Sequence, residues 1–176
     1  RREPENFDHV TAFPYASVAN IPTFTVEKLL ALPPWHATHD QGQEGACVGF
    51  GVSMMMAIKN MHQCMQQGAK DPYIRYNPWW LWDRAKEIDV WSNTNPGDSN
   101  GTSVDAACKI LHTKGHVTWD NEADKTSCGP VNPNFGVLTY RWATTVDEVR
   151  AAINEDNPVA IGVRWYKAFD QPEYHN

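Results

Sequence analysis

Apolar residues recur at helical spacing in several stretches of the chain, and polar or glycine-rich segments separate these stretches. The clearest stripe begins near residue 46 and has an apolar residue every third or fourth position: Phe50, Met54, Ala57, Met61 and Met65. A stripe of this kind faces the protein core, where methionine side chains fill irregular gaps. The helix is expected to end near Gly68.

Three further helices are expected, over residues 76–89, 102–115 and 144–157. The first has a proline near its start, which is typical of the first helical turn. The other two begin with residues at capping-box spacing, Thr102 with Asp105 and Thr145 with Glu148. Gly115 provides a C-cap for the helix over 102–115.

Strands are expected near the end of the chain, over 136–142 ("GVLTYRW") and 158–166 ("PVAIGVRWY"). The second run is almost continuously apolar at its start and is therefore expected to be buried. Helices come first and strands follow with one helix between them, an order that predicts an α+β fold. We expect an N-terminal arm over 1–32, a helical half over 33–115 and a partial β-rich half over 116–176.

Composition narrows the function classes. The chain has 176 residues, 41% of them hydrophobic, and 8 tryptophans, which is enough for a packed core. The net charge is −6 and no basic run is present, so nucleic acid is not expected as a partner. No stretch is long and apolar enough to predict a membrane span. The chain starts at Arg1 and ends on "FDQPEYHN", and we expect it to be part of a longer protein.

The four cysteines do not predict a metal site. They are Cys47, Cys64, Cys108 and Cys128, and no two of them have the spacing of a zinc-binding pair. No metal or other cofactor is expected. A disulfide from Cys128 to Cys108 or to Cys64 is open on the sequence, as are free thiols.

The segment "DQGQEGACVGFG" (40–51) contains the strongest candidate for chemistry. Cys47 is expected where the apolar helix begins, and the positive end of a helix stabilises a thiolate. Gly42 and Gly45 allow a tight turn and the close approach of a substrate chain. The amide of Gln41 is placed to donate to an oxyanion together with the backbone N–H of Cys47. The simpler alternative is that Cys47 is a small buried apolar residue.

This segment resembles the active-site segment of papain-like cysteine peptidases, whose pattern runs N/D-Q-G-x-C-G-S/A-C-W-x-F. Gln41 falls on the oxyanion glutamine of that pattern and Cys47 on its nucleophile, with the same spacing. The resemblance continues in order from about residue 32 to residue 169. It implies that the "NGT" of residues 100–102 corresponds to the glycine-containing substrate wall. The substrate-binding residues implied are Gly45, Asn100, Gly101 and Thr102.

The sequence departs from the family pattern at three points. Glu44 stands where a disulfide cysteine is usual and Val48 where an aromatic residue is usual, as in bacterial or bacteriophage members. The catalytic histidine and asparagine of the family lie roughly 130–150 residues after the cysteine, and so are expected beyond residue 176. His175 is near the edge of this window, but its surrounding sequence does not match. His39 is a further, weaker candidate for the base.

The remaining histidines are expected to have structural roles. His112 and His116 flank the end of the helix over 102–115, where a positive charge suits the helix dipole. His62 lies on the nucleophile's own helix, too far along it to reach Cys47.

The resemblance implies a cysteine peptidase that hydrolyses peptide bonds of a peptide or protein substrate. Cys47 would attack the carbonyl carbon and Gln41 would stabilise the oxyanion. The alternative is a non-catalytic module with a structural or binding role in a larger assembly such as a phage virion. A third hypothesis is a transglutaminase-like relative that uses the same chemistry. An extracellular or virion-associated location fits these readings better than a nuclear or membrane location.

Overall fold

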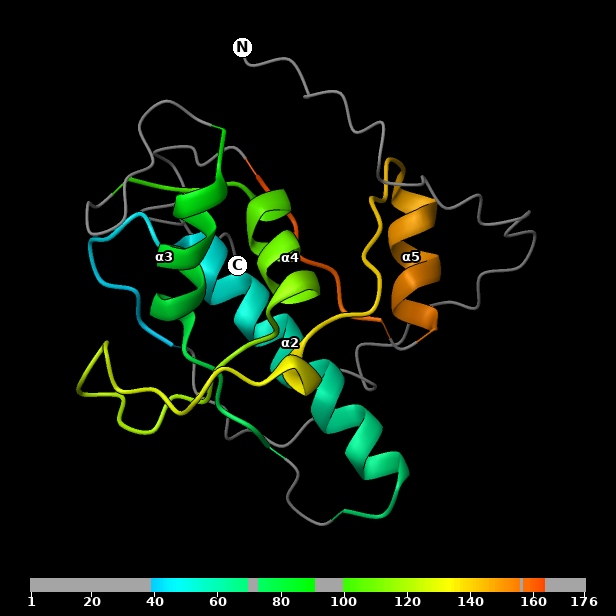
Figure 1. The fold of residues 1–176 in the computed structure, drawn as a ribbon. Helices are drawn as coiled ribbons and strands as arrows, with labels where there is room; N and C mark the ends of the chain where they lie inside the picture. The colour runs from blue at the N-terminus through cyan, green and yellow to red at the C-terminus, as the bar shows by residue number, and fades with distance from the viewer. Residues whose placement is uncertain (1–38, 70–72, 91–99, 156, 164–176) are drawn as a thin grey trace, which may run out of the picture.

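The computed structural model describes residues 39–69, 73–90, 100–155 and 157–163 (Figure 1). The predicted N-terminal arm over 1–32 lies outside these residues. The described residues form four α-helices and one 3-10 helix: α2 (Cys47–Gln66), α3 (Pro78–Ile88), α4 (Val104–Thr113), η1 (Pro133–Phe135) and α5 (Val146–Asn154). The four predicted helices are thus confirmed, with small shifts at their ends.

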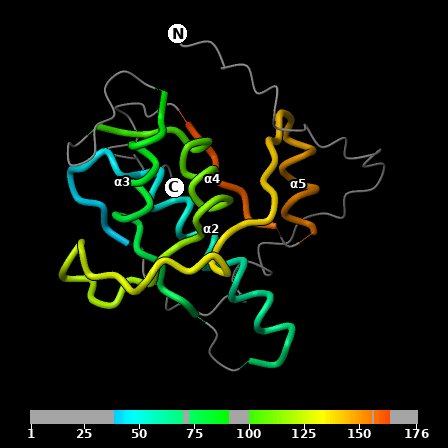
Figure 2. Tube along the Cα trace, in the orientation of Figure 1, coloured from blue at the N-terminus to red at the C-terminus, as the bar shows by residue number. Residues whose placement is uncertain are grey.

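Helices α2, α3 and α4 pack against one another and enclose the main core (Figures 1 and 2). Of the predicted apolar stripe of α2, Ala57 packs in this core and Phe50 and Met61 are also buried, whereas Met54 is half-buried and Met65 near the helix end is 44% exposed. Val52 and Met56, which the predicted stripe did not include, complete the contribution of α2 to this core. The other helices contribute side chains that are fully or almost fully buried: Leu81, Ala85, Ala107, Ile110 and Leu111. Removing such apolar surface from water stabilises the packing of the three helices by roughly 25 cal/mol per Å² buried.

Helix α2 passes very close to the start of α3, and a glycine makes this approach possible. A Cβ atom on Gly49 would overlap the carbonyl oxygen of Pro78 and would lie 2.8 Å from Cβ of Trp82. Gly51, in the same helix, has nothing within 4 Å of its Cβ position and is exposed. The two helices therefore touch backbone to backbone at Gly49.

The caps of α3 and α5 agree with the sequence. Asn77 caps α3, since its side chain accepts a hydrogen bond from the backbone N–H of Trp80 at 3.0 Å, and Pro78 follows in the first turn. At α5, Thr145 and Glu148 form the predicted capping box. Gly68 and Gly115, just after α2 and α4, have positive φ angles of 86° and 85°.

The predicted cap of α4 is wrong by one residue. Ser103 is the N-cap, and its hydroxyl accepts from the backbone N–H of Ala106 at 3.1 Å. The hydroxyl of Thr102 instead donates to Asp89 Oδ2 at 2.6 Å. Thr102, which the capping-box spacing predicted as the N-cap, therefore bonds to the carboxylate of Asp89 outside the helix and does not cap α4.

The predicted α+β fold class is wrong. The described residues contain no strand and no sheet, which does not fit a papain-like α+β fold. Residues 136–142 and 158–163 have no regular secondary structure, and residues 164–166 lie outside the described part. The burial expected for the second run is also absent, because Ile161 is 68% exposed and Val163 is 63% exposed. A strand needs the backbone of a second strand, and the described residues supply only isolated bridges.

Within the described ranges, no helix is both long enough and apolar enough to cross a membrane.

The contact at Gly49 gives a test of the helix packing. We expect Gly49→Ala to lower the free energy of unfolding by about 1–3 kcal/mol, because the new methyl group overlaps the backbone of α3. Gly51→Ala is the matched control, and we expect it to raise stability by about 0.5–1 kcal/mol, since alanine favours the helix and meets no neighbour. Chemical denaturation of the three proteins measures both changes. Equal effects of the two substitutions would contradict this helix crossing.

Candidate active site

The loop before α2 is closed by hydrogen bonds within itself. The side chain of Asp40 accepts from the backbone N–H of Gly42 at 2.7 Å, and Gly42 has a positive φ of 63°. Gln41 Nε2 donates to the carbonyl oxygen of Glu44 at 2.9 Å. An amide group carries two N–H donors, so this bond fixes the amide of Gln41 and leaves one donor for another acceptor.

Cys47 is the first residue of α2 and is exposed. The N-cap residue, Ala46, is fully buried and offers no side-chain cap, and the first turn contains no acidic residue. The first N–H groups of a helix have no partner within the helix. The thiol of Cys47 therefore lies at a helix end where the positive dipole is not compensated by a side chain of that turn.

The candidate substrate wall lies beside this loop. The indole N–H of Trp82 donates to the carbonyl oxygen of Asn100 at 3.2 Å. A Cβ atom on Gly101 would lie 3.5 Å from the carbonyl oxygen of Gly45, so these two glycines face each other. The structure thus brings Asn100 and Gly101 next to the loop that leads to Cys47.

Thr102 holds the wall in place through its side chain. It is 3% exposed, and its hydroxyl and the backbone N–H of Ser103 each donate to Asp89 Oδ2 at 2.6 Å. Its hydroxyl is therefore engaged within the protein. Sequence reasoning missed both Asp89 and Trp82 as anchors of the wall. No local pattern indicates them, because each contacts a segment well beyond its own helix.

The ring of His39 contacts partners other than Cys47. Its Nε2 lies 3.4 Å from the hydroxyl oxygen of Tyr73 and its Nδ1 lies 3.8 Å from Glu122. The ring also packs against Trp119, with 5.6 Å between ring centroids. Burial lowers the pKa of His39, and the nearby carboxylate of Glu122 opposes this shift. No hydrogen bond joins any histidine of the described part to Cys47.

His116 is a core residue and not a cation at a helix end, so that expectation is wrong. It is fully buried and stacks on Tyr76. Its Nδ1 accepts from the backbone N–H of Val117 at 2.9 Å, which assigns the proton of the neutral ring to Nε2, 2.8 Å from Ser53 Oγ. The pair is therefore not a serine activated by a base, since the nitrogen that faces Ser53 is the donor. Burial lowers the pKa of His116 to about 3.

His112, His62 and His175 do not supply a general base for Cys47 among the described contacts. His112 is exposed at the end of α4, where its Nδ1 lies 3.1 Å from the carbonyl oxygen of Val137. His62 lies on the same helix as Cys47, four turns further along. His175 lies outside the described residues.

All four cysteines are free thiols, so neither disulfide that the sequence left open is formed. Cys108 is buried, and this burial, with the charge of Asp105, raises the pKa of its thiol to about 12. Cys64 is half-buried and Cys128 is exposed. In the described ranges, no three histidine, cysteine, aspartate or glutamate side chains are grouped as a metal site would require.

Comparison of the chain with known protein families, curated proteins and solved structures found no match. The similarity to papain-like cysteine peptidases therefore depends on the residues of the 41–51 segment and on the order of the motifs that follow. The chemistry open to the site follows from its own geometry: an exposed thiol at a helix start, a fixed amide and a facing backbone wall.

The neutral core state of His116 predicts how stability changes with pH. The unfolded chain takes up a proton near pH 6.5 and the folded protein only near pH 3, so the unfolded state binds more protons between these values. We expect stability to fall as the pH falls from 6.5 towards 3. His116→Gln, which keeps a donor for Ser53, should make this fall shallower. Urea unfolding across this pH range measures the slope.

The control for this experiment is His112→Gln, since His112 is exposed and its Nδ1 lies 3.1 Å from a backbone carbonyl oxygen, that of Val137. This variant should keep the wild-type slope. A slope that His116→Gln leaves unchanged would contradict the assignment of His116 as a neutral buried residue.

Proposed function

We propose that the chain provides the nucleophile of a cysteine-type peptidase, with Cys47 attacking a carbonyl carbon of a peptide or protein substrate. The observation that supports this most is the exposed thiol of Cys47 at the start of a 20-residue helix with no side-chain cap. Attack forms a tetrahedral oxyanion, and loss of the amine leaves a thioester, which water hydrolyses. The proposal rests on this site and not on an α+β fold.

Two donors are available for the oxyanion. One is the backbone N–H of Cys47, which lies in the first turn and has no acceptor within the helix. The other is the free N–H of the Gln41 amide, whose orientation is fixed by its bond to the Glu44 carbonyl. Donors held in place before the reaction stabilise developing charge without a reorganisation cost.

The wall supports an extended peptide as the substrate. Asn100 and Gly101 lie beside Gly45, and no side chain stands between the two glycines where they face each other. Backbone that is held by Trp82 on one side and by Asp89 on the other offers fixed donors and acceptors to a peptide main chain.

A Cys–His mechanism also needs an imidazole that accepts the thiol proton and delivers it to the leaving amine. None of the described histidines contacts Cys47, so the proposal requires a histidine outside the described residues. This same observation favours a second candidate function, a non-catalytic module that binds a peptide or protein within a larger assembly. The two candidates share the wall and differ in whether Cys47 is acylated.

The first test is the reactivity of Cys47 relative to Cys128, the other exposed cysteine. We expect iodoacetamide to modify Cys47 about two- to fivefold faster near pH 7, because a helix dipole favours a negative charge by about 0.3–1 kcal/mol. Cys108 should react last, since it is buried and its thiol pKa is raised. Peptide mass spectrometry over a time course gives the three rates.

Unfolding in guanidinium is the control, and it should bring the rates of Cys47 and Cys128 together. The reactivity assigned to the helix start would be contradicted if Cys128 reacted as fast as Cys47 in the native protein.

The second test concerns Gln41 in the full-length protein. We expect Gln41→Ala to lower kcat on a peptide substrate by about 10²–10³, with a smaller change in KM, because the amide acts on charge that develops in the transition state. Gln41→Glu should be worse, since a carboxylate repels the oxyanion. Steady-state kinetics and thermal melting on the same preparations separate this role from a structural one.

Gln43→Ala is the matched control for this test, because Gln43 is an exposed glutamine of the same loop. It should leave kcat unchanged. Loss of activity that follows loss of melting temperature in Gln41→Ala would indicate a loop-stabilising role instead.

A further inference from the structure

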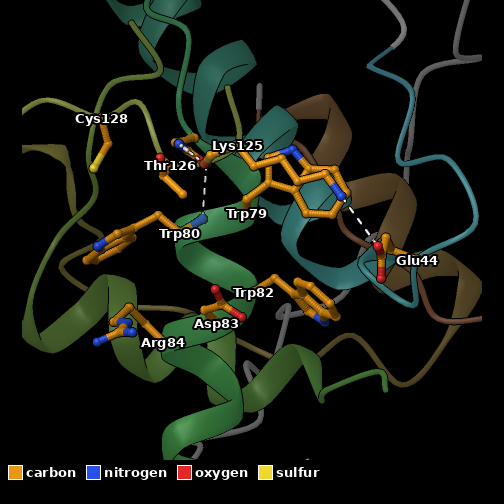
Figure 3. Close-up of a pocket in the computed structure, with 10 residues that line it drawn as sticks. Glu44, Trp79, Trp80, Trp82, Asp83, Arg84, Lys125, Thr126 and Cys128 are labelled. Carbon is orange, nitrogen blue, oxygen red and sulfur yellow. Dashed lines mark hydrogen bonds and ion pairs between the residues drawn. The ribbon is translucent and has the colours of Figure 1, made fainter. Parts of the chain in front are cut away.

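A pocket of about 370 Å³ lies between the first half of α3 and the loop around residues 125–128 (Figure 3). Its walls include the three tryptophans of α3, Trp79, Trp80 and Trp82, and its charged lining includes Glu44 and Lys125. Ligand pockets are typically apolar cavities of this size that carry a few polar groups. Neither of the proposed functions accounts for this pocket.

Lys125 shows what kind of group the pocket holds. Its Nζ lies 3.9 Å from the ring centroid of Trp79 and 3.4 Å from Glu44 Oε1 (Figure 3). An ammonium group is thus held between an aromatic face and a carboxylate, and both of these groups attract cations. The Lys125 side chain is 54% exposed, so it contacts the pocket from the solvent side.

A second lysine, in helix α3, is a useful contrast. Lys86 Nζ lies 3.6 Å from the ring centroid of Trp82 and 3.7 Å from Asp83 Oδ1, and its side chain is fully buried. Lys86 is therefore a fixed part of the core. An exposed ion pair contributes little to stability, so Lys125 is displaced at small cost and Lys86 is not.

The pocket is connected to the candidate active site at two points. Glu44 belongs to the loop that leads to Cys47, and its carbonyl oxygen accepts the hydrogen bond from Gln41. Trp82 is one of the residues that line the pocket, and its indole N–H donates to the carbonyl oxygen of Asn100 in the wall. A group bound in this pocket would therefore lie beside both the nucleophile loop and the wall.

We propose that this pocket binds the basic side chain of a lysine or arginine residue of a peptide ligand, and that Lys125 occupies the pocket in the absence of the ligand. Two acidic and two basic residues line the pocket, so their charges sum to zero: Glu44, Asp83, Arg84 and Lys125. Arg84 is already paired with Glu87 at 2.6 Å. Asp83 is likewise paired with Lys86 at 3.7 Å. Displacement of Lys125 therefore leaves the carboxylate of Glu44 without its cation, which favours a basic group of the ligand.

That the peptide ligand is a substrate rests on the proposed function, but binding of the peptide does not require catalysis. The test therefore uses Cys47→Ala protein and measures binding alone. The probe is N-acetylarginine amide, and N-acetylcitrulline amide is its neutral counterpart of the same shape. Isothermal titration calorimetry gives the dissociation constants.

We expect Lys125→Ala to bind N-acetylarginine amide at least about fivefold more tightly than the parent protein, because the competing ammonium group is gone. The affinity for N-acetylcitrulline amide should not change. Adding Glu44→Gln to Lys125→Ala should remove the gain. Lys114→Ala is the control for net charge, because Lys114 is exposed at the end of α4, and it should leave both affinities unchanged.

An equal gain in Lys114→Ala, an equal gain for the citrulline probe, or no measurable binding of N-acetylarginine amide to Lys125→Ala would each overturn the proposal. Any of these results would leave the peptidase proposal standing if Gln41→Ala lowers kcat as expected. Conversely, tight binding of the arginine probe by a protein without peptidase activity would support the pocket and favour the non-catalytic module.

Discussion

The close contact of α2 with α3 at Gly49 is the constraint on which the rest of the structure depends. Because Gly49 has no side chain, the backbone of α2 reaches the carbonyl oxygen of Pro78 and the Cβ of Trp82. Cys47 is two residues before this contact, so the crossing sets where the thiol lies relative to α3. Trp82 in turn holds Asn100. The absence of a side chain at Gly49 thus allows the helix crossing that places Cys47, the pocket and the wall relative to one another.

Hydrogen bonds from side chains to backbone groups hold the loop around residues 124–127 in place, as the hydrogen bonds of a sheet would in another fold. Asn77 is fully buried, and its amide donates to the carbonyl oxygens of Lys125 and Ser127 at 3.0 and 3.1 Å. The indole N–H of Trp119 donates to the carbonyl oxygen of Asp124 at 3.0 Å. Buried amides without partners are costly, so these bonds fix the loop strongly. They also fix the position from which Lys125 reaches the pocket.

The sequence predicted the features that depend on near neighbours and failed on those that depend on distant ones. The helix α2 itself, Pro78 at the start of α3 and the capping box of α5 are local, and all three are confirmed. The predicted stripe of α2 is confirmed only at Phe50, Ala57 and Met61. The strands were wrong because a strand needs a partner that its own pattern does not reveal. The cap of α4 and the charge of His116 were wrong because Asp89 and complete burial, respectively, decide them. The pocket combines residues of three segments and had no sequence signal beyond its tryptophans.

Magnitudes decide how much chemistry the described residues are able to supply. A helix dipole contributes about 0.3–1 kcal/mol to a charge at its end, and one oxyanion donor contributes about 2.7–4 kcal/mol. Enzymes lower activation barriers by about 8 kcal/mol or more, so Cys47 and Gln41 together reach at most part of this value. The general base supplies the next contribution, about 10²–10⁴-fold in rate. The presence of an imidazole near Cys47 in the full-length protein is therefore what separates a peptidase from a binding module built on the same wall and pocket.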